Sequence, residues 1–314
     1  MKPRALFAKL WDDQFALLPQ GSHATISGGG ISGLHLAEAL TLKGVRVTLY
    51  DLKKTGGVRI PLMRACQSEK PHSALWQRAA AFTREKFHTL PQAAFGIDVR
   101  NNWFVINTRA YLRALRTRLQ EQGVVFVHAE APSSQSDLHF NASGAGGYMS
   151  PVTRVAAGYE SYWGRLKSHE ETALKEKAIP HYLRSATRAA LVHTEIKPIG
   201  ELCQDAHRVH PHARHAIFYG ERLTCRDRLP LVGFDTHTAA LSYDVLREKF
   251  IREPFDVYAR AQEFPFLFTA MGYHAFTYAP YLASVVAKHL TGHARDNENL
   301  VCTLTPTRFL SRKQ

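Results

Sequence analysis

The sequence predicts an α/β protein built around a Rossmann-like domain that binds a dinucleotide. Three observations predict this fold: a short β-compatible run at residues 24–27, a Gly-x-Gly-x-x-Gly sequence directly after it, and a second stretch of alternating apolar and polar residues that ends in an acidic residue. With 314 residues, of which 45% are hydrophobic, the chain can bury a sizeable core. At about 100 to 200 residues per domain, this length suggests two domains.

The first strand, the loop and the first helix follow one another without a gap. Residues 24–27 form a β-compatible run, and the glycines of the motif are Gly28, Gly30 and Gly33. Residues 31–43 have helical spacing, with an apolar face formed by Ile31, Leu34, Ala37 and Leu40. Gly44 ends this helix, residues 45–49 alternate as a strand does, and Asp51 closes that strand 18 residues after Gly33.

Each part of this motif has a separate task in dinucleotide binding. The first glycine permits a tight turn, the second lets backbone N–H groups approach a pyrophosphate, and the third lets the helix pack closely on the strand. Ile31 and Ser32 begin the helix, whose N-terminus favours the negative charge of the pyrophosphate. Asp51 can accept hydrogen bonds from ribose hydroxyls. The alternative is a glycine-rich turn with a structural role, and the motif by itself does not distinguish FAD from NAD.

A segment in the C-terminal third resembles the FAD-dependent D-amino-acid-oxidase-like (DAO) family. It reads YGERLTCRDRLPLVGFD over residues 219–235, and the family pattern of G-x-R followed by T-x-D-x-L-P-x-V-G is matched at Gly220, Arg222, Asp227, Leu229, Pro230 and Gly233. Arg226 agrees with one branch of that family, the flavin domain of the tRNA-modification enzyme MnmC, whereas Cys225 stands where the family usually has Thr. The resemblance implies that the cofactor is FAD and that Gly233 lies close to it.

The same resemblance assigns substrate binding to Arg222. A guanidinium suits this task because it can form a bidentate, charge-assisted pair with a carboxylate. The alternative is an ordinary surface ion pair between Arg222 and Glu221 or Asp227. We expect Asp227 and Pro230 to be structural and to fix the turn that carries Arg222 and Gly233 toward the flavin.

Residues 268–292 resemble the last strand, the flavin-facing glycine loop and the closing helix of the family, with matches at Gly272, Ala279 and Pro280. We expect Pro280 to be the first residue of that helix. The family's loop is richer in glycine than Tyr273, His274 and Ala275. We expect Tyr273 and His274 either to contact the flavin or substrate, as catalytic residues, or to pack as partly buried polar side chains. Residues 264–287 hold no Asp, Glu, Lys or Arg, but Pro and Gly interrupt them, which favours a soluble core over a membrane span.

Two weaker matches complete the resemblance. Residues 136–147 are similar to the family's A-x-G segment, with Ala142 and Gly144 near the cofactor, and residues 55–63 are similar to a loop that passes under it, with Gly57 and Pro61 matching. The predicted fold is therefore a discontinuous FAD-binding Rossmann-like domain at 22–150 and 219–314, with an inserted α+β substrate domain at 151–218. Within the insertion, residues 181–183 and 188–193 are predicted strands. Residues 1–21 are an N-terminal extension, too short to supply a methyltransferase domain.

The charge of the chain bears on its partner. Forty Lys and Arg against 27 Asp and Glu give a net charge of +13, which would attract RNA or an anionic substrate; the alternative explanation is a generally basic proteome. The four cysteines lie far apart and form no C-x-x-C pair, so they indicate neither a disulfide framework nor a thiolate zinc site, and a reducing cytosol fits. We expect no metal site, and we interpret as chance the histidines that lie close together in the sequence: His207, His210, His212 and His215.

The resemblance implies an FAD-dependent oxidoreductase that acts on a CH–NH group. Its tRNA branch implies removal of the carboxymethyl group of carboxymethylaminomethyl-uridine at the tRNA wobble position, with tRNA as partner and a cytoplasmic location. The first alternative is an oxidase or dehydrogenase of a small free amino acid, such as glycine or a D-amino acid. The second is a flavin fold that binds RNA or protein without catalysis.

Overall fold

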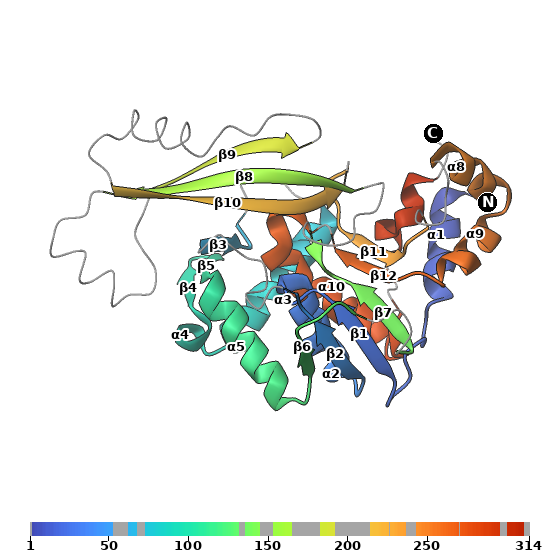
Figure 1. Cartoon of the computed structure of the whole chain (residues 1–314), viewed down its shortest axis with the longest axis horizontal. Helices are drawn as coiled ribbons and strands as arrows, with labels where there is room; N and C mark the ends of the chain where they lie inside the picture. Colours follow the sequence, from blue (N-terminus) through green and yellow to red (C-terminus); the bar gives the residue numbers. More distant parts are fainter. Residues whose placement is uncertain are drawn as a thin grey trace.

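The computed structural model (Figure 1) describes residues 2–52, 62–67, 73–131, 136–144, 153–164, 183–191, 214–225, 227–236, 243–269, 271–295 and 300–310. For residues 153–164, 183–191 and 214–222, and for Pro3, Leu62, Thr224, Tyr243, Asp244 and Tyr273, it describes the backbone alone.

A six-stranded sheet lies at the centre of the molecule, in the order β11-β12-β7-β1-β2-β6. Its strands are β1 (His23–Ser27), β2 (Arg46–Tyr50), β6 (Val125–Val127), β7 (Leu138–Asn141), β11 (Leu231–Phe234) and β12 (Phe266–Thr269). All neighbouring pairs are parallel except β11 and β12. The carboxyl ends of β1, β2, β6, β7 and β12 therefore meet at one edge. This arrangement confirms the predicted α/β class and its Rossmann-like sheet.

Helices cover this sheet and share its core. They are α2 (Ile31–Thr41), α3 (Ala74–Thr89), α4 (Gln92–Phe95), α5 (Thr108–Glu121) and α10 (Ala275–Leu290). Helix α10 packs on α2 and α3, and α2 also packs on α5. The side chain of Tyr111 is fully buried at this junction, where its ring lies 5.5–5.6 Å from the rings of Phe87, Phe95 and Phe276.

Helix α2 ends as the sequence predicts. Gly44 adopts a φ of +78°, which a glycine reaches without steric cost. Its N–H donates to the carbonyl of Thr41, and the N–H of Val45 reaches back to Leu40. These bonds satisfy carbonyls that the end of a helix leaves open, and they turn the chain directly into β2.

Helix α10 begins earlier than expected. Residues 268–292 do form the expected strand end, glycine turn and helix, because β12 leads into the 3-10 turn η2 (Gly272–His274) and then into α10. Pro280 was expected to open the helix, and this prediction is wrong because α10 starts at Ala275 and contains Pro280 in its interior. An interior proline removes one helical hydrogen bond, at a cost of about 3 kcal/mol. Buried packing on both sides of it, with Ala279 and Leu282 fully enclosed, offsets that cost.

Two antiparallel sheets accompany the central one. The first, in the order β3-β5-β4, contains β3 (Leu62–Ala65), β4 (Ile97–Arg100) and β5 (Trp103–Asn107). The second, in the order β10-β8-β9, contains β8 (Thr153–Gly164), β9 (Leu183–Leu191) and β10 (Arg214–Cys225), and it extends along one side of the molecule (Figure 1). Where two short strands were predicted, β9 is one continuous strand, because its whole length pairs with β8. The proposed domain boundaries stay a prediction.

The N-terminal extension is part of the folded core. It forms α1 (Pro3–Asp12), whose Trp11 stacks on His289 of α10 with 4.2 Å between ring centroids. His289 Nε2 also lies 2.7 Å from the carbonyl oxygen of Trp11, and the N–H of Leu18 donates to Leu290 at 2.7 Å. Figure 1 shows α1 near α8 (Tyr243–Arg252) and α9 (Pro254–Ala261) at one end of the molecule. Of the helices in the described ranges, none has both the length and the apolar character needed to cross a membrane.

Candidate cofactor and active site

The glycine-rich loop follows β1 at the carboxyl edge of the central sheet. It lies between the ends of β2 and β7, the two strands that pair with β1. The N–H of Gly28 donates to the carbonyl of Tyr50 at the end of β2, at 2.8 Å. The N–H of Ala142, just after β7, donates to the carbonyl of Ser27 at 2.8 Å. Segments that are far apart in the sequence, including the predicted A-x-G segment, are therefore held against the loop. Ligands of open α/β sheets bind at this edge.

The loop packs too closely for side chains at two of its positions. A Cβ on Gly33 would lie 1.9 Å from the carbonyl oxygen of Gly28. A Cβ on Gly28 would lie 2.6 Å from the carbonyl oxygen of Ala142, and the φ of Gly28 is +112°. Gly30 is the N-cap of α2, so that Ile31 and Ser32 form its first turn. The first N–H groups of a helix have no partner within the helix, and here they form a site suited to a pyrophosphate.

Asp51 follows β2 at the same edge. It is 7% exposed, and a Cβ on Gly29 would lie 2.4 Å from its Oδ2 atom. Arg116 of α5 places Nη1 3.7 Å from the same oxygen, and His128 Nδ1 hydrogen-bonds the Asp51 carbonyl at 2.8 Å. The carboxylate therefore lies directly beside the loop, where a ribose joined to the pyrophosphate would reach it. Gly29 was missed because the motif leaves that position open.

The other residues predicted to bind the cofactor are less clearly placed. Gly144, with a φ of +63°, follows a turn in which Asn141 Oδ1 accepts hydrogen bonds from the N–H and Oγ of Ser143. Gly272 opens η2 with a φ of +57°. Gly233 has a φ of +133°, a backbone conformation that favours glycine, and a Cβ on it would lie 3.3 Å from side-chain atoms of Thr305 and Pro306, so local packing accounts for a glycine there. Gly57 and Pro61 lie outside the described residues.

The turn η2 contacts β10, the strand that carries Arg222. The backbone of Arg222 pairs with Ala156 of β8, and its side chain lies outside the described part of the chain, as does that of Tyr273. The structure thus brings the strand of Arg222 and the loop of Tyr273 and His274 together. Their catalytic roles stay a prediction.

His274 belongs to an aromatic cluster that the sequence did not reveal. Its ring packs edge-to-face with Trp76 of α3 at 6.4 Å and with Tyr278 of α10 at 6.1 Å. Burial raises the pKa of Tyr278, partly offset by a hydrogen bond with Ser73. Both expected roles of His274 remain open, since a packed ring can still present an edge to a ligand. Residues 76 and 274 are too far apart in sequence for any local pattern to pair them.

Asp227 has the structural role that was expected. Its Oδ1 accepts a hydrogen bond from the N–H of Leu229 at 3.1 Å, which closes the turn before β11. It also pairs with Arg308 through Nε to Oδ2 at 2.8 Å and Nη2 to Oδ1 at 3.2 Å. The bidentate partner of Asp227 is therefore Arg308, in the C-terminal segment.

Nucleophilic and metal chemistry find no support in the described residues. Cys66 is buried, and burial raises the pKa of its thiol to about 12, so the thiol stays protonated. Burial likewise raises the pKa of Cys225 to about 12. Within the described ranges no group of His, Cys, Asp and Glu could hold a metal ion. His207, His210 and His212 lie outside those ranges, and only the backbone of His215 is described.

A buried polar network joins α2, the helix that follows the nucleotide loop, to α3 and α5. His35 of α2 places Nδ1 3.2 Å from Glu38 Oε2 and Nε2 3.0 Å from the hydroxyl of Tyr111. Lys86 of α3 donates to the same Glu38 oxygen. Burial, together with the charge of Lys86, lowers the pKa of His35 to about 4, although Glu38 opposes the shift. Burial would raise the pKa of Glu38, but the hydrogen bonds and charges of His35 and Lys86 lower it to about 2.

These pKa values fix the direction of each hydrogen bond in the network. An ionised Glu38 can only accept, so Nδ1 of a neutral His35 carries the proton and donates it. Nε2 then accepts from the hydroxyl of Tyr111. Since His35, Glu38 and Tyr111 are all buried, the network connects α2, α3 and α5 and offers no surface to a substrate.

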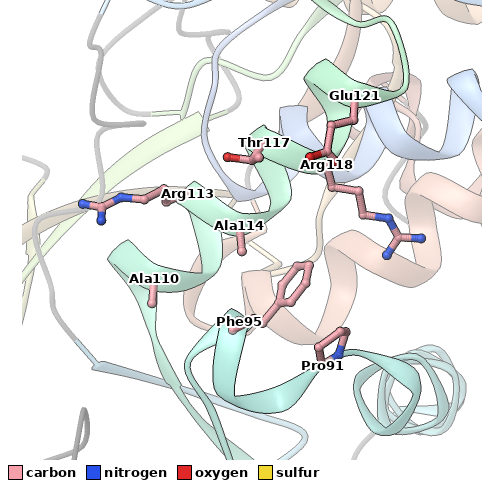
Figure 2. A pocket seen from close by; sticks show the side chains of 9 residues that line it. Pro91, Phe95, Ala110, Arg113, Ala114, Thr117, Arg118 and Glu121 are labelled. Atoms are coloured by element: carbon pink, nitrogen blue, oxygen red, sulfur yellow. The ribbon is translucent and has the colours of Figure 1, made fainter. Parts of the chain in front are cut away.

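A shallow groove lies between α4 and α5 (Figure 2). Its floor holds Phe95, Ala110 and Ala114, and the side chains of Arg113 and Arg118 extend from α5 in different directions. No residue that was predicted to bind cofactor or substrate lines it. We therefore assign the site to the carboxyl edge of the sheet.

Comparison with solved structures identifies the fold. Glycine oxidase from Geobacillus kaustophilus superposes with a TM-score of 0.60 at 12% identity, over 91% of this chain and 99% of that one. The chain has the fold of glycine oxidase. L-proline dehydrogenase from P. horikoshii gives a TM-score of 0.58 at 12% identity, over 93% and 98% of the two chains. L-amino acid deaminase from Proteus vulgaris gives 0.56 at 11% identity, over 94% and 98%.

Comparisons of sequence give no match. No family model matches the chain, and no curated protein matches it. At 11–12% identity the likeness to the solved structures concerns the fold, and function has to be argued from the site.

Proposed function

We propose that the chain is an FAD-dependent oxidoreductase that acts on a CH–NH group of an amino acid or amine. The observation that carries the proposal is the loop at the carboxyl edge, where Gly28 and Gly33 exclude side chains and the Asp51 carboxylate lies beside the backbone. Those residues suit the pyrophosphate and ribose of a dinucleotide. The resemblance to the DAO family selects FAD. The names of the three similar structures support amine chemistry.

The chain's residues would bind and orient rather than react. The N-terminus of α2 would hold the pyrophosphate and Asp51 the ribose. Bound FAD would accept a hydride from the carbon next to the amine nitrogen, and water would then hydrolyse the resulting imine. Arg222 would hold the substrate carboxylate so that this carbon faces the ring. Burial of the cluster around His274 would help to exclude water from the reacting atoms.

The finer proposal is that the substrate is carboxymethylaminomethyl-uridine at the wobble position of tRNA, in the cytoplasm. It is supported by the match of Arg226 to the tRNA-modifying branch and by the net charge of +13, which favours a polyanion. In this reaction Arg222 would hold the carboxylate of the carboxymethyl group. Oxidation and hydrolysis would release that group as a two-carbon aldehyde acid and leave the aminomethyl form.

A small free amino acid is the second candidate. It is favoured by the similar structures, whose names specify glycine, proline and amino acids. Glycine and the tRNA carboxymethyl group would release the same two-carbon aldehyde acid, so that product alone does not separate the two substrates. The amine product does, because glycine would leave ammonia and the tRNA would keep the aminomethyl group.

The test is anaerobic reduction of the flavin, followed as loss of its visible absorbance band. The purified, FAD-loaded protein is mixed with tRNA that bears the modified uridine, with unmodified tRNA, with glycine or with D-alanine. We expect reduction by modified tRNA, abolished in Arg222→Ala and unchanged in a matched exposed variant, Arg109→Ala. Reduction by a free amino acid alone would replace the tRNA proposal by the second candidate. Flavin that no amine reduces would indicate a fold that binds without catalysis.

A further inference from the structure

Arg116 of α5 lies beside the acid predicted to bind ribose, and no motif accounts for it. Its guanidinium carbon lies over the ring of Phe126, 4.4 Å from the centroid. Its Nη1 lies 3.7 Å from Asp51 Oδ2. The side chain is 31% exposed, so the ring of Phe126 and the Asp51 carboxylate leave part of the guanidinium open to solvent.

The contact with Phe126 places Arg116 more firmly than the contact with Asp51 does. At 3.7 Å the ion pair is longer than a charge-assisted hydrogen bond, so it fixes the orientation of the guanidinium less closely. A guanidinium over an aromatic ring gains both dispersion and cation–π attraction. The ring of Phe126 therefore supports the guanidinium of Arg116 from one side and holds it at the carboxyl edge of the sheet.

The position of this pair follows from the strand order. β6, which carries Phe126, pairs in parallel with β2, and the N–H of Asp51 donates to the carbonyl of Val127 at 3.0 Å. Phe126 and Asp51 thus lie at the same carboxyl edge. In a dinucleotide site the acid at this point binds the ribose that carries the adenine. The adenine must then lie close to that carboxylate, which is where the guanidinium of Arg116 is found.

We propose that Arg116 is a positioning residue for the adenine of the bound cofactor. The guanidinium, supported from behind by Phe126, stacks on the face of the base with its remaining open surface. Arginine is suited to this task because its planar group stacks on flat rings, whereas the compact ammonium of lysine does not. This inference rests on the proposed function insofar as the ligand is FAD, but its chemistry concerns any adenosine diphosphate.

The test measures affinity and needs no turnover. FAD binding to the apoprotein is followed by quenching of flavin fluorescence, and ADP and ribose 5-diphosphate are titrated as competitors. Ribose 5-diphosphate lacks only the base of ADP. In Arg116→Ala we expect FAD and ADP to bind about tenfold more weakly, while ribose 5-diphosphate changes by less than about twofold.

Three further variants make the test specific. Arg116→Lys keeps the charge but not the planar group, and we expect it to bind ADP as weakly as Arg116→Ala. Phe126→Leu removes the supporting ring, and we expect a loss of the same kind. Arg113→Ala removes a neighbouring arginine of α5 that lines the groove of Figure 2, and we expect wild-type affinity. Thermal unfolding of each variant shows that it is folded.

The inference is overturned if Arg116→Ala binds ADP as the wild type does, if Arg116→Lys restores affinity, or if ribose 5-diphosphate is weakened equally. A wild-type protein that binds ADP in this way but not FAD would retain the inference and refute the flavin proposal. A wild-type protein that binds neither would refute both.

Discussion

Replacing His35 with Gln should reduce the loss of stability that the protein shows as the pH falls from 6.5 to about 4. In the native state burial, with a further contribution from Lys86, lowers the pKa of His35 from 6.5 to about 4. The unfolded chain therefore binds a proton below pH 6.5 that the native chain does not bind until about pH 4. Because the folded-state pKa is the lower one, this group's contribution to stability is complete above pH 6.5 and is lost as the pH falls toward 4.

The size of the effect follows from the pKa difference. At about 1.4 kcal/mol for each unit, the shift corresponds to a loss of about 3 kcal/mol across that pH window. Glutamine cannot titrate, yet its amide can donate to Glu38 and accept from the hydroxyl of Tyr111, as the imidazole does. We expect His35→Gln to lose stability with a shallower slope than the wild type between pH 6.5 and pH 4.

The assay is urea unfolding at a series of pH values across this window, for wild type and variant. His88→Gln is the matched control because His88 lies on α3 at the surface, and we expect it to keep the wild-type slope. Equal slopes for His35→Gln and wild type would refute the assigned network. So would an equal loss of slope in the control.

Two other predictions concern the loop and the N-terminal extension. Gly33→Ala would place a Cβ 1.9 Å from the Gly28 carbonyl oxygen, so we expect loss of FAD binding by at least about tenfold and a lower Tm. The control is Leu42→Ala, at the exposed far end of α2, and unchanged flavin content in Gly33→Ala would contradict the packing described. Trp11→Ala would leave a cavity at a fully buried position beside His289. We expect the free energy of unfolding, measured with urea, to fall by about 3–5 kcal/mol. A loss below about 1 kcal/mol would show that α1 is not part of the core.

The nucleotide half of the site could be predicted from sequence because its constraints are local. Gly28 and Gly33 lie five residues apart and must be glycine for reasons of backbone geometry, and Asp51 follows at the distance that one helix and one strand require. A sequence motif with fixed spacing, such as Gly-x-Gly-x-x-Gly followed by an acid, can express such constraints. The motif does not specify Gly29, because the group that leaves no room for a side chain there, the Asp51 carboxylate, follows the next strand, β2.

Other features depend on contacts that no local pattern contains. Arg116 reaches Asp51 only because β6 pairs with β2, and Trp76 reaches His274 only because α3 packs on α10. Pro280 misled the prediction for a related reason. Its preference for the start of a helix is a local property, and the packing of α10 outweighs it.

The early start of α10 has a consequence for the site. The first N–H groups of the helix are those of Ala275 and its successors, so the positive end of the helix dipole lies at η2. That turn contacts β10, the strand of Arg222, and its own last residue is His274. Had the helix begun at Pro280, this positive end would lie more than a turn further along the chain. The positive end of α10 therefore lies at the turn that contacts the strand of Arg222, where it would favour the carboxylate that we propose Arg222 binds.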